Sequence, residues 1–406
     1  MKHLLIVLWI LGMPIFALCQ PSIVWQQTFG GTGYDQGRDI AITSDGGFAF
    51  LGHTESNNGD IDVFHGVVDY WVATFNVLGE LKWSHTYGGS SHDWPVDFAS
   101  TLEGGFVVVG YTSSVDGDVT GFHGEKDGWV IKIDQLGNIE WQKAIGGSGW
   151  DEIWCVNQTT DGGYIVGGRT TSIDGDLAGL SPKGYLDFWI LKLSSTGQIE
   201  WQKRLGGSYE ETVRAIKQTY DGGFIAVGYT LSNNGDVSGN HGNSDIWLVK
   251  LRSNGEVDWA KTFGGSYAET AHDIEETEDA FFMCGVAGSV DGDLTLNQGS
   301  GDAWILKTDK SGNILWQTTI GGSVSDYAFD GFPTPDGGYI FTGATKSNDG
   351  DVQDFKGVQD ILVGRLKNDG TLLWLKTLGG SDGDAAYAID QTPDGGLIIG
   401  GNTWST

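Results

Sequence analysis

The chain has 406 residues, with 66 Gly, 17 Trp and a formal net charge of −30. The Trp content excludes a low-complexity disordered chain, because such chains lack the apolar side chains that build a core. Acidic residues outnumber basic ones by 53 to 23 and no stretch is rich in Lys and Arg, which excludes a surface that tracks phosphates. We therefore expect no nucleic-acid partner.

Residues 1–19 read as a secretory signal peptide: Lys2 precedes an apolar run from Leu4 to Leu18. The run is shorter than the ~20 residues of a spanning helix, and no second apolar segment follows, so we expect no membrane span. Cleavage before Gln20 would give a secreted or cell-surface protein. The alternative is an acylated lipoprotein cysteine at Cys19. We assign residues 1–19 to the signal peptide and 20–406 to one domain.

Two cysteines remain in the mature chain, Cys155 and Cys284. They occupy different places in the repeat described below, so we expect no disulfide between them. Neither has CxxC spacing, and both are interpreted as small buried hydrophobic residues.

A repeat of about 58 residues covers nearly the whole mature chain. Its marker is a Trp followed five or six residues later by a Gly pair. The Trp residues are Trp25, Trp83, Trp141, Trp201, Trp259, Trp316 and Trp374. Each period contains four short apolar runs of strand length, which we call a, b, c and d, and no run favours a helix.

Glycine-rich turns separate the predicted strands. Most a–b connections read Asp-Gly-Gly, as at Asp161, which suits a tight hairpin. The fifth unit has Glu278-Asp279-Ala280 instead, and we expect a looser turn there. Antiparallel four-stranded units of this length without helices are typical of β-propeller blades.

The predicted fold is an all-β, seven-bladed β-propeller with four-stranded antiparallel blades of about 58 residues. Six units are complete. The seventh supplies strands a and b before Thr406, and its strand d comes from residues 23–29, so the termini close the ring. Strand c of this blade is missing. One explanation is a C-terminally truncated chain; the other is a three-stranded blade in which strand d pairs directly with strand b.

The pattern W-x-x-x-[FYIL]-G-G, then D-G-G-[FY], then G-x-T-x-S, then D-x-W resembles the SBBP-type β-propeller repeats of bacterial secreted and surface proteins. The resemblance covers residues 23–403. It implies a secreted scaffold and provides no catalytic residues to transfer. Many such proteins end in a C-terminal sorting domain, which this sequence does not show.

Acidic residues recur in the b–c loops, where an Asp/Asn-Gly-Asp turn is followed nine to eleven residues later by another Asp. Carboxylates near a glycine turn can form an oxygen cage for calcium. The candidate ligands are Asp60, Asp69, Asp116, Asp118, Asp127, Asp174, Asp176, Asp187, Asp236, Asp245, Asp291, Asp293, Asp302, Asp349, Asp351 and Asp360. The alternative is ordinary turn chemistry, in which these side chains accept hydrogen bonds from nearby backbone N–H groups.

Two sets of aromatic residues have different interpretations. Trp71, Trp129, Trp189, Trp247 and Trp304, with Leu362 in the sixth unit, recur in strand c and are predicted to pack between blades. Tyr34, Trp94, Trp150, Tyr209, Tyr267 and Tyr327 vary between units at the entry to strand a. They are candidates for ligand stacking or for simple rim packing. His65, His123 and His241 are interpreted as polar loop residues.

No motif of a hydrolase, nucleotide-binding or Rossmann site occurs in the sequence. The favoured hypothesis is a non-enzymatic, monomeric scaffold that binds an extracellular glycan, peptide or protein, without a cofactor other than calcium. The alternatives are a glycoside-cleaving enzyme, a quinone-dependent enzyme and a structural spacer of a longer surface protein. The segment IDQLGNIEWQ resembles quinoprotein repeats. No break in the repeat that would mark an active site is evident in the sequence.

Overall fold

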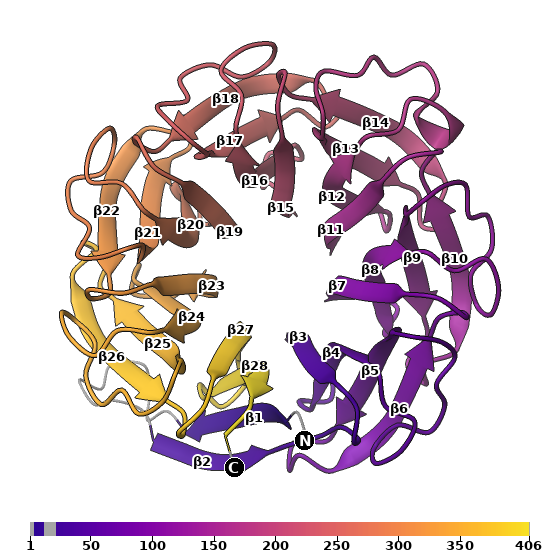
Figure 1. Ribbon diagram of the computed structural model, residues 1–406, viewed down its shortest axis with the longest axis horizontal. Coiled ribbons are helices and arrows are strands. Elements are labelled where there is room, and N and C mark those ends of the chain that lie inside the picture. Colours follow the sequence, from indigo (N-terminus) through magenta and orange to yellow (C-terminus); the bar gives the residue numbers. More distant parts are fainter. Residues whose placement is uncertain (1–3, 12–21, 406) are drawn as a thin grey trace.

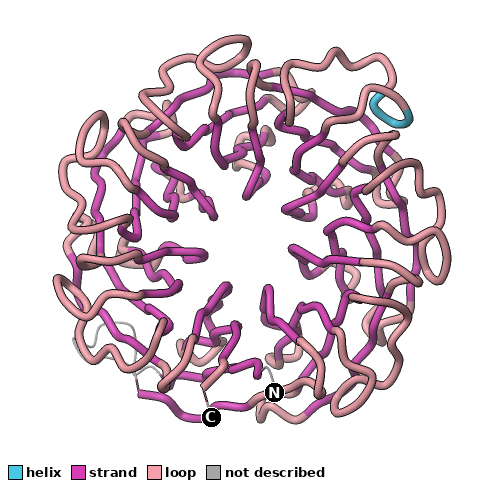
Figure 2. The backbone as a smooth tube through the Cα atoms, viewed as in Figure 1, coloured by secondary structure: helices cyan, strands magenta, loops and turns pink. Residues whose placement is uncertain are grey.

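The computed structural model describes residues 4–11 and 22–405, which form four-stranded antiparallel sheets arranged radially around a central channel (Figure 1). Six of these sheets are blades made from one continuous segment each. Loops join the strands, and within these described ranges the one short helix is the 3₁₀ turn η1 (Gly175–Leu177) in a b–c loop (Figure 2). The all-β propeller architecture is therefore confirmed.

The strands of the six blades run from the channel outward in chain order. Blade 1 contains β3 (Asp35–Ile42), β4 (Phe48–Thr54), β5 (Asp69–Phe75) and β6 (Leu81–Tyr87); blade 2 contains β7 (Asp93–Ser100), β8 (Phe106–Thr112), β9 (Asp127–Ile133) and β10 (Ile139–Ile145); blade 3 contains β11 (Asp151–Gln158), β12 (Tyr164–Thr170), β13 (Asp187–Leu193) and β14 (Ile199–Leu205). Blade 4 contains β15 (Glu211–Gln218), β16 (Phe224–Thr230), β17 (Asp245–Leu251) and β18 (Val257–Phe263); blade 5 contains β19 (Glu269–Glu276), β20 (Ala280–Ala287), β21 (Asp302–Asp309) and β22 (Ile314–Ile320); blade 6 contains β23 (Asp326–Pro333), β24 (Tyr339–Thr345), β25 (Asp360–Leu366) and β26 (Leu372–Leu378).

The two ends of the chain meet in one composite sheet. Its order is β2 (Ser22–Gln27), β1 (Leu4–Leu11), β28 (Leu397–Thr403) and β27 (Asp384–Gln391). Strand β1 pairs antiparallel with β28 from Leu4 opposite Thr403 to Ile10 opposite Leu397, and it also pairs with β2. The inserted strand satisfies backbone groups that would otherwise face a gap in the ring.

This sheet corrects the predicted architecture. A seven-bladed propeller with an incomplete last blade is wrong: six blades are continuous four-stranded units, and the closing sheet is a four-stranded composite of both chain ends. Direct pairing of strands b and d is also wrong, because β1 lies between β28 and β2. The sequence could not show this, because strand pairing between distant segments is not encoded in a local pattern.

Strand β1 belongs to the segment predicted to be a signal peptide. Cleavage before Gln20 would remove it from the ring. The predicted cleavage site and Cys19 lie outside the described residues. Within the residues that the structure describes, no helix is long and apolar enough to cross a membrane.

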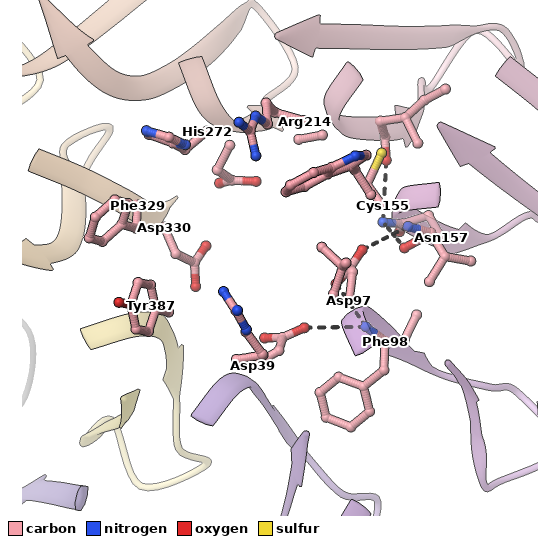
Figure 3. Close-up of a pocket in the computed structure, with 18 of the residues that line it drawn as sticks. Asp39, Asp97, Phe98, Cys155, Asn157, Arg214, His272, Phe329, Asp330 and Tyr387 are labelled. Carbon is pink, nitrogen blue, oxygen red and sulfur yellow. Dashed lines mark hydrogen bonds between the residues drawn. The ribbon is translucent and has the colours of Figure 1, made fainter. Parts of the chain in front are cut away.

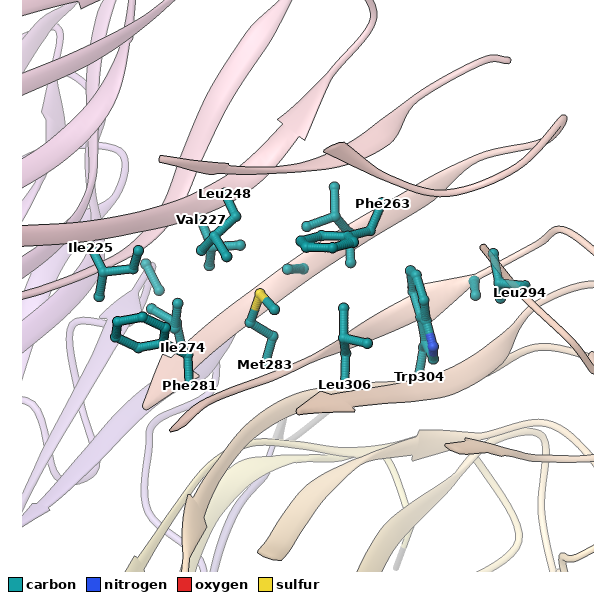
Figure 4. Packing of buried hydrophobic residues seen from close by; sticks show 14 residues of the cluster. Ile225, Val227, Leu248, Phe263, Ile274, Phe281, Met283, Leu294, Trp304 and Leu306 are labelled. Atoms are coloured by element: carbon teal, nitrogen blue, oxygen red, sulfur yellow. The ribbon is translucent and has the colours of Figure 1, made fainter. Parts of the chain in front are cut away.

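The core lies between neighbouring blades. In one cluster, Val227 and Leu248 of blade 4 pack against Met283 and Trp304 of blade 5 (Figure 4). Trp71, Trp129, Trp189, Trp247 and Trp304 are among the largest fully buried side chains, and Leu362 is buried at the corresponding place. The predicted packing role of the strand c residues is confirmed, because large apolar side chains fill the wedge between splayed sheets.

The a–b turns contain the expected glycines at positive φ, as at Gly162 (φ 81°). The turn of blade 5 differs from its prediction. Thr277 N–H donates to Ala280 O, whereas the corresponding bond in blade 3 joins Thr159 N–H to Gly163 O. The turn is one residue shorter, and therefore tighter rather than looser.

Candidate functional site: the central channel

The innermost strand of each sheet has a bulge that turns one side chain toward the channel. In β3, for example, the register with β4 shifts between Gly37 and Asp39, which leaves Arg38 outside the ladder. Bulges re-aim side chains in this way. The bulge residues around the ring are Arg38, Val96, Trp154, Arg214, His272, Phe329 and Tyr387.

These bulge residues vary between sheets, with Arg in two of them and a different residue in each of the other five, although the strands around them repeat. They line a cavity of about 440 Å³ in the channel. This volume lies in the usual range of small-molecule pockets. Figure 3 shows Arg214, Asp330, Asp97 and Asp39 around one open space. The break in repeat symmetry that sequence reasoning did not detect is therefore located here. Aligning the strands on their bulges would have provided the signal.

Carboxyl groups one residue beyond the bulge form a second layer. They belong to Asp39, Asp97, Asp273 and Asp330. In the other three sheets the same position is occupied by Cys155, Ala215 and Ala388. Most of these carboxylates join neighbouring sheets: Asp97 Oδ2 accepts the Val156 N–H at 2.7 Å, and Asp330 Oδ2 accepts the Ile389 N–H at 2.7 Å. The layer therefore has a structural role as well as facing the cavity.

Burial raises the pKa of these carboxyl groups. The pKa of Asp273 rises to about 7, chiefly through burial, and burial and the neighbouring Asp97 raise the pKa of Asp39. Protonated carboxyl groups can donate as well as accept hydrogen bonds. The layer is thus suited to polar, hydroxyl-bearing groups.

These raised pKa values predict a protein that is more stable at pH 5 than at pH 8. Asp273 keeps its proton in the folded state up to about pH 7, whereas the unfolded state releases it near pH 4, so stability falls as pH rises between these values. His272, whose pKa burial lowers to about 3, opposes this trend below about pH 6.5, because the unfolded state takes up a proton there that the folded state does not. The contribution of Asp45, whose pKa the Lys82 hydrogen bond lowers to about 2, is lost only below about pH 4. Thermal melting between pH 4.5 and 8 measures the trend.

The matched variant for this trend is Asp273→Asn, which removes one titrating group and should flatten part of the pH dependence. A melting temperature that rises steadily from pH 5 to pH 8 would contradict the expectation.

Basic and aromatic side chains also lie around the cavity. The guanidinium carbon of Arg38 lies 5.3 Å from the Trp94 ring centroid, and that of Arg214 lies 4.2 Å from the Trp154 centroid. The Phe329 ring contacts both Tyr387 and His272. Burial lowers the pKa of His272 to about 3, so its ring is neutral at pH 7.

The variable aromatics at the entry to strand a have divided roles. Trp94 stacks on His53 at 4.0 Å between ring centroids, Tyr34 also contacts His53, and Tyr327 stacks on Phe329 near the channel. Trp150, Tyr209 and Tyr267 are exposed on the rim. The structure therefore brings only part of this set toward the channel.

The Asp/Asn-Gly-Asp turns of the b–c loops bind backbone groups of the Gly-Gly loops. In blade 2, Asp118 Oδ2 accepts the Gly88 N–H at 3.1 Å and Asp116 Oδ1 accepts the Ser90 N–H at 2.7 Å. The same bond from a Gly N–H to the second Asp of the turn occurs at Asp60, Asp176, Asp236, Asp293 and Asp351. The bond from a Ser N–H to the first Asp recurs at Asp174, Asp291 and Asp349. This is the geometry of the turn-chemistry alternative.

The Asp that precedes each strand c tryptophan is buried. Asp127 Oδ2 accepts the His123 N–H at 2.8 Å, and its Oδ1 is buried without a partner. Such an unpartnered Oδ1 also occurs in Asp69, Asp245, Asp302 and Asp360. In blade 3 the equivalent Asp187 binds Arg204 instead. His65, His123 and His241 each contact this Asp through Nδ1, so these three histidines are partners of an aspartate rather than free loop residues.

Calcium binding at these loops stays a prediction. Among the residues that the structure describes, no group of three or more His, Cys, Asp or Glu side chains is arranged to hold a metal ion. If the loops do bind calcium, millimolar calcium will raise the melting temperature and a chelator will reverse the rise, with about 2.7 kcal/mol per site at 100 times Kd. Asp118→Asn keeps an oxygen for Gly88 N–H and provides the control, since it should reduce only the calcium effect. An unchanged melting temperature would leave the turn-chemistry interpretation.

Both described cysteines, Cys155 and Cys284, are buried and free, as predicted. Burial raises the pKa of each thiol well above its usual value. A thiol that stays protonated is a poor nucleophile. Cys155 therefore lines the cavity as a small apolar side chain.

Comparisons with family models and with curated proteins found no match. Among solved structures, the chain is similar to the Pan2 WD40 domain of Neurospora crassa, with 11% identity over 90% of this chain and 88% of that one, and a TM-score of 0.50. It is also similar to a quinonprotein alcohol dehydrogenase-like protein from Bacteroides thetaiotaomicron, with 13% identity over 87% of this chain and 68% of that one, and a TM-score of 0.46. At 11% identity the likeness to the WD40 domain concerns the fold alone.

Proposed function

We propose that this protein is a secreted or cell-surface, non-enzymatic β-propeller that binds an extracellular ligand, with a glycan as the favoured class, in its central channel. One observation carries the proposal: the bulge residues that face the cavity vary between sheets, with Arg in two of them and a different residue in each of the other five, on strands that otherwise repeat. Packing alone would favour the same residue at each repeat, as in the strand c tryptophans. Unit-specific polar and aromatic side chains around one cavity are typical of a ligand site.

The carboxyl groups of the channel support binding rather than glycoside cleavage. Cleavage needs two separate carboxyl groups on either side of the scissile bond, about 5 Å apart or more. Asp39, Asp97 and Asp330 instead each accept a hydrogen bond from a backbone N–H group of the next sheet. The hydrogen bonds of these side chains therefore connect neighbouring sheets.

Export is supported by the predicted signal peptide and by the resemblance to SBBP-type repeats. The N-terminus of the exported protein tests this part of the proposal. Mass spectrometry should find a mature chain that begins at Gln20, whereas a chain that retains Leu4–Leu11 would contradict cleavage and keep β1 in the ring.

Screening the purified protein against a glycan array, followed by calorimetry on the hits, tests the binding site. Val96→Trp places a large ring at a bulge position facing the cavity and should abolish binding. Val257→Trp adds the same ring on the outer strand β18, where Val257 is exposed, and should leave binding unchanged. Equal binding by both variants would exclude the channel. Conversion of a bound glycan into products would show an enzyme instead.

A further inference from the structure

Two cationic side chains enter the cavity from strands on opposite sides of the ring. Arg38 lies on β3 and Arg214 on β15, and Figure 1 shows these two strands facing each other across the channel. Both side chains are bulge residues and line the cavity. They carry positive charge into the centre of a protein whose formal net charge is −30.

Neither guanidinium has an acidic partner in the part of the chain that the structure describes, and the Nε of each is buried without a hydrogen bond. Other cations of this region are neutralised. Lys217 Nζ lies 2.7 Å from Glu275 Oε1, and Arg169 Nε lies 2.7 Å from Glu152 Oε2. Burying an unpaired charge is unfavourable, and burial accordingly lowers the pKa of both Arg38 and Arg214.

Aromatic rings hold the two guanidinium groups by their faces. Arg214 lies over Trp154 and also near Tyr229, at 4.2 and 5.7 Å from the ring centroids, and Arg38 lies near Trp94 and Tyr387. A stacked guanidinium keeps its N–H donors in the ring plane, where they can bind a carboxylate in a two-point contact. The stacks therefore orient the donors without using them.

The layer beyond the arginines suits a different part of the same ligand. Its carboxyl groups, including Asp39, Asp273 and Asp330, exchange hydrogen bonds with hydroxyl groups. Burial raises the pKa of all three. A ligand that fits both layers has an anionic group at the level of the arginines and hydroxyl groups beyond it, and the exposed parts of rings such as Phe329 and Tyr387 can stack on a sugar.

We propose that the channel ligand is an acidic carbohydrate whose carboxylate groups bind Arg38 and Arg214 and whose hydroxyl groups face the carboxyl layer. This inference rests on the proposed glycan-binding function and adds the charge of the ligand and the residues that select it. The carboxylates neutralise the guanidinium groups.

Calorimetry with trigalacturonate and its neutral counterpart, a galactose trimer, tests the proposal on the full exported chain. We expect the acidic trimer to bind at least tenfold more tightly. Arg38→Gln and Arg214→Gln should each reduce its affinity at least tenfold and leave that of the neutral trimer nearly unchanged. Arg252→Gln removes an exposed arginine on a c–d turn and serves as the charge-matched control, with an expected change below twofold.

Lysine variants separate recognition from folding. Arg214→Lys keeps the positive charge and should retain part of the affinity that Arg214→Gln loses, provided that thermal melting shows both variants folded. Equal affinity for the acidic and neutral trimers would overturn this inference and leave the proposed glycan binding in place. Binding of neither trimer, with no hit on a glycan array, would overturn both.

Discussion

Replacing Trp189 with alanine is expected to destabilise the protein by about 3–5 kcal/mol, the usual cost of removing a buried tryptophan. Trp189 is fully buried, packs against valines of blade 2 such as Val107 and Val130, and donates its indole N–H to Gln202 Oε1 at 3.0 Å. The substitution leaves a cavity between two blades and an amide without its partner. Urea denaturation followed by circular dichroism measures the loss.

Trp150→Ala is the control for this prediction. Trp150 is 44% exposed at the channel rim, where its indole N–H contacts Glu125 and its ring lies near Lys126. We expect a change within about 0.5 kcal/mol, because few of its contacts are buried. Similar losses for both variants would show that the strand c tryptophans are not the main packing between blades.

Replacing Arg204 with alanine is expected to cost about 3–5 kcal/mol, because it leaves a buried carboxylate without its counter-charge. The guanidinium of Arg204 binds Asp187 and the Ser172 carbonyl, and both charged side chains are almost completely buried, at 2% and 0% exposed. No other blade has an arginine at this position; blade 4, for example, has Thr262. The effect is measured by denaturant unfolding at pH 7.

The second substitution Asp187→Asn should restore much of the lost stability, since it removes the uncompensated charge. Arg252→Ala breaks an exposed pair with Asp258 and should cost less than about 1 kcal/mol. If Arg204→Ala has no larger effect than Arg252→Ala, the buried pair does not stabilise blade 3.

For much of the candidate site, the sequence showed which residue types are present but not which of them lie close together. The acidic loop residues were located correctly in the b–c connections, yet their hydrogen bonds to Gly-Gly loops join positions 25 to 30 residues apart, as between Asp291 and Ser266 or Asp118 and Gly88. The bulge that turns Arg38 and Arg214 into the channel leaves no mark in hydrophobic alternation. It shifts the register of a pair of strands, and register is a property of both strands together.

By itself, the sequence determined the repeat length, the four strands of each unit and the turns between them, because alternation and glycine turn chemistry act over a few neighbouring residues. The burial of the strand c tryptophans also followed from their regular recurrence. The sequence also predicted that residues 23–29 would join the last blade and close the ring, and only the tertiary structure placed β1 between β28 and β2. It likewise brought Arg38 and Arg214, one from each of two distant repeats, into the same cavity. A pocket formed by one residue from each sheet exists only once long-range packing has arranged the sheets around an axis.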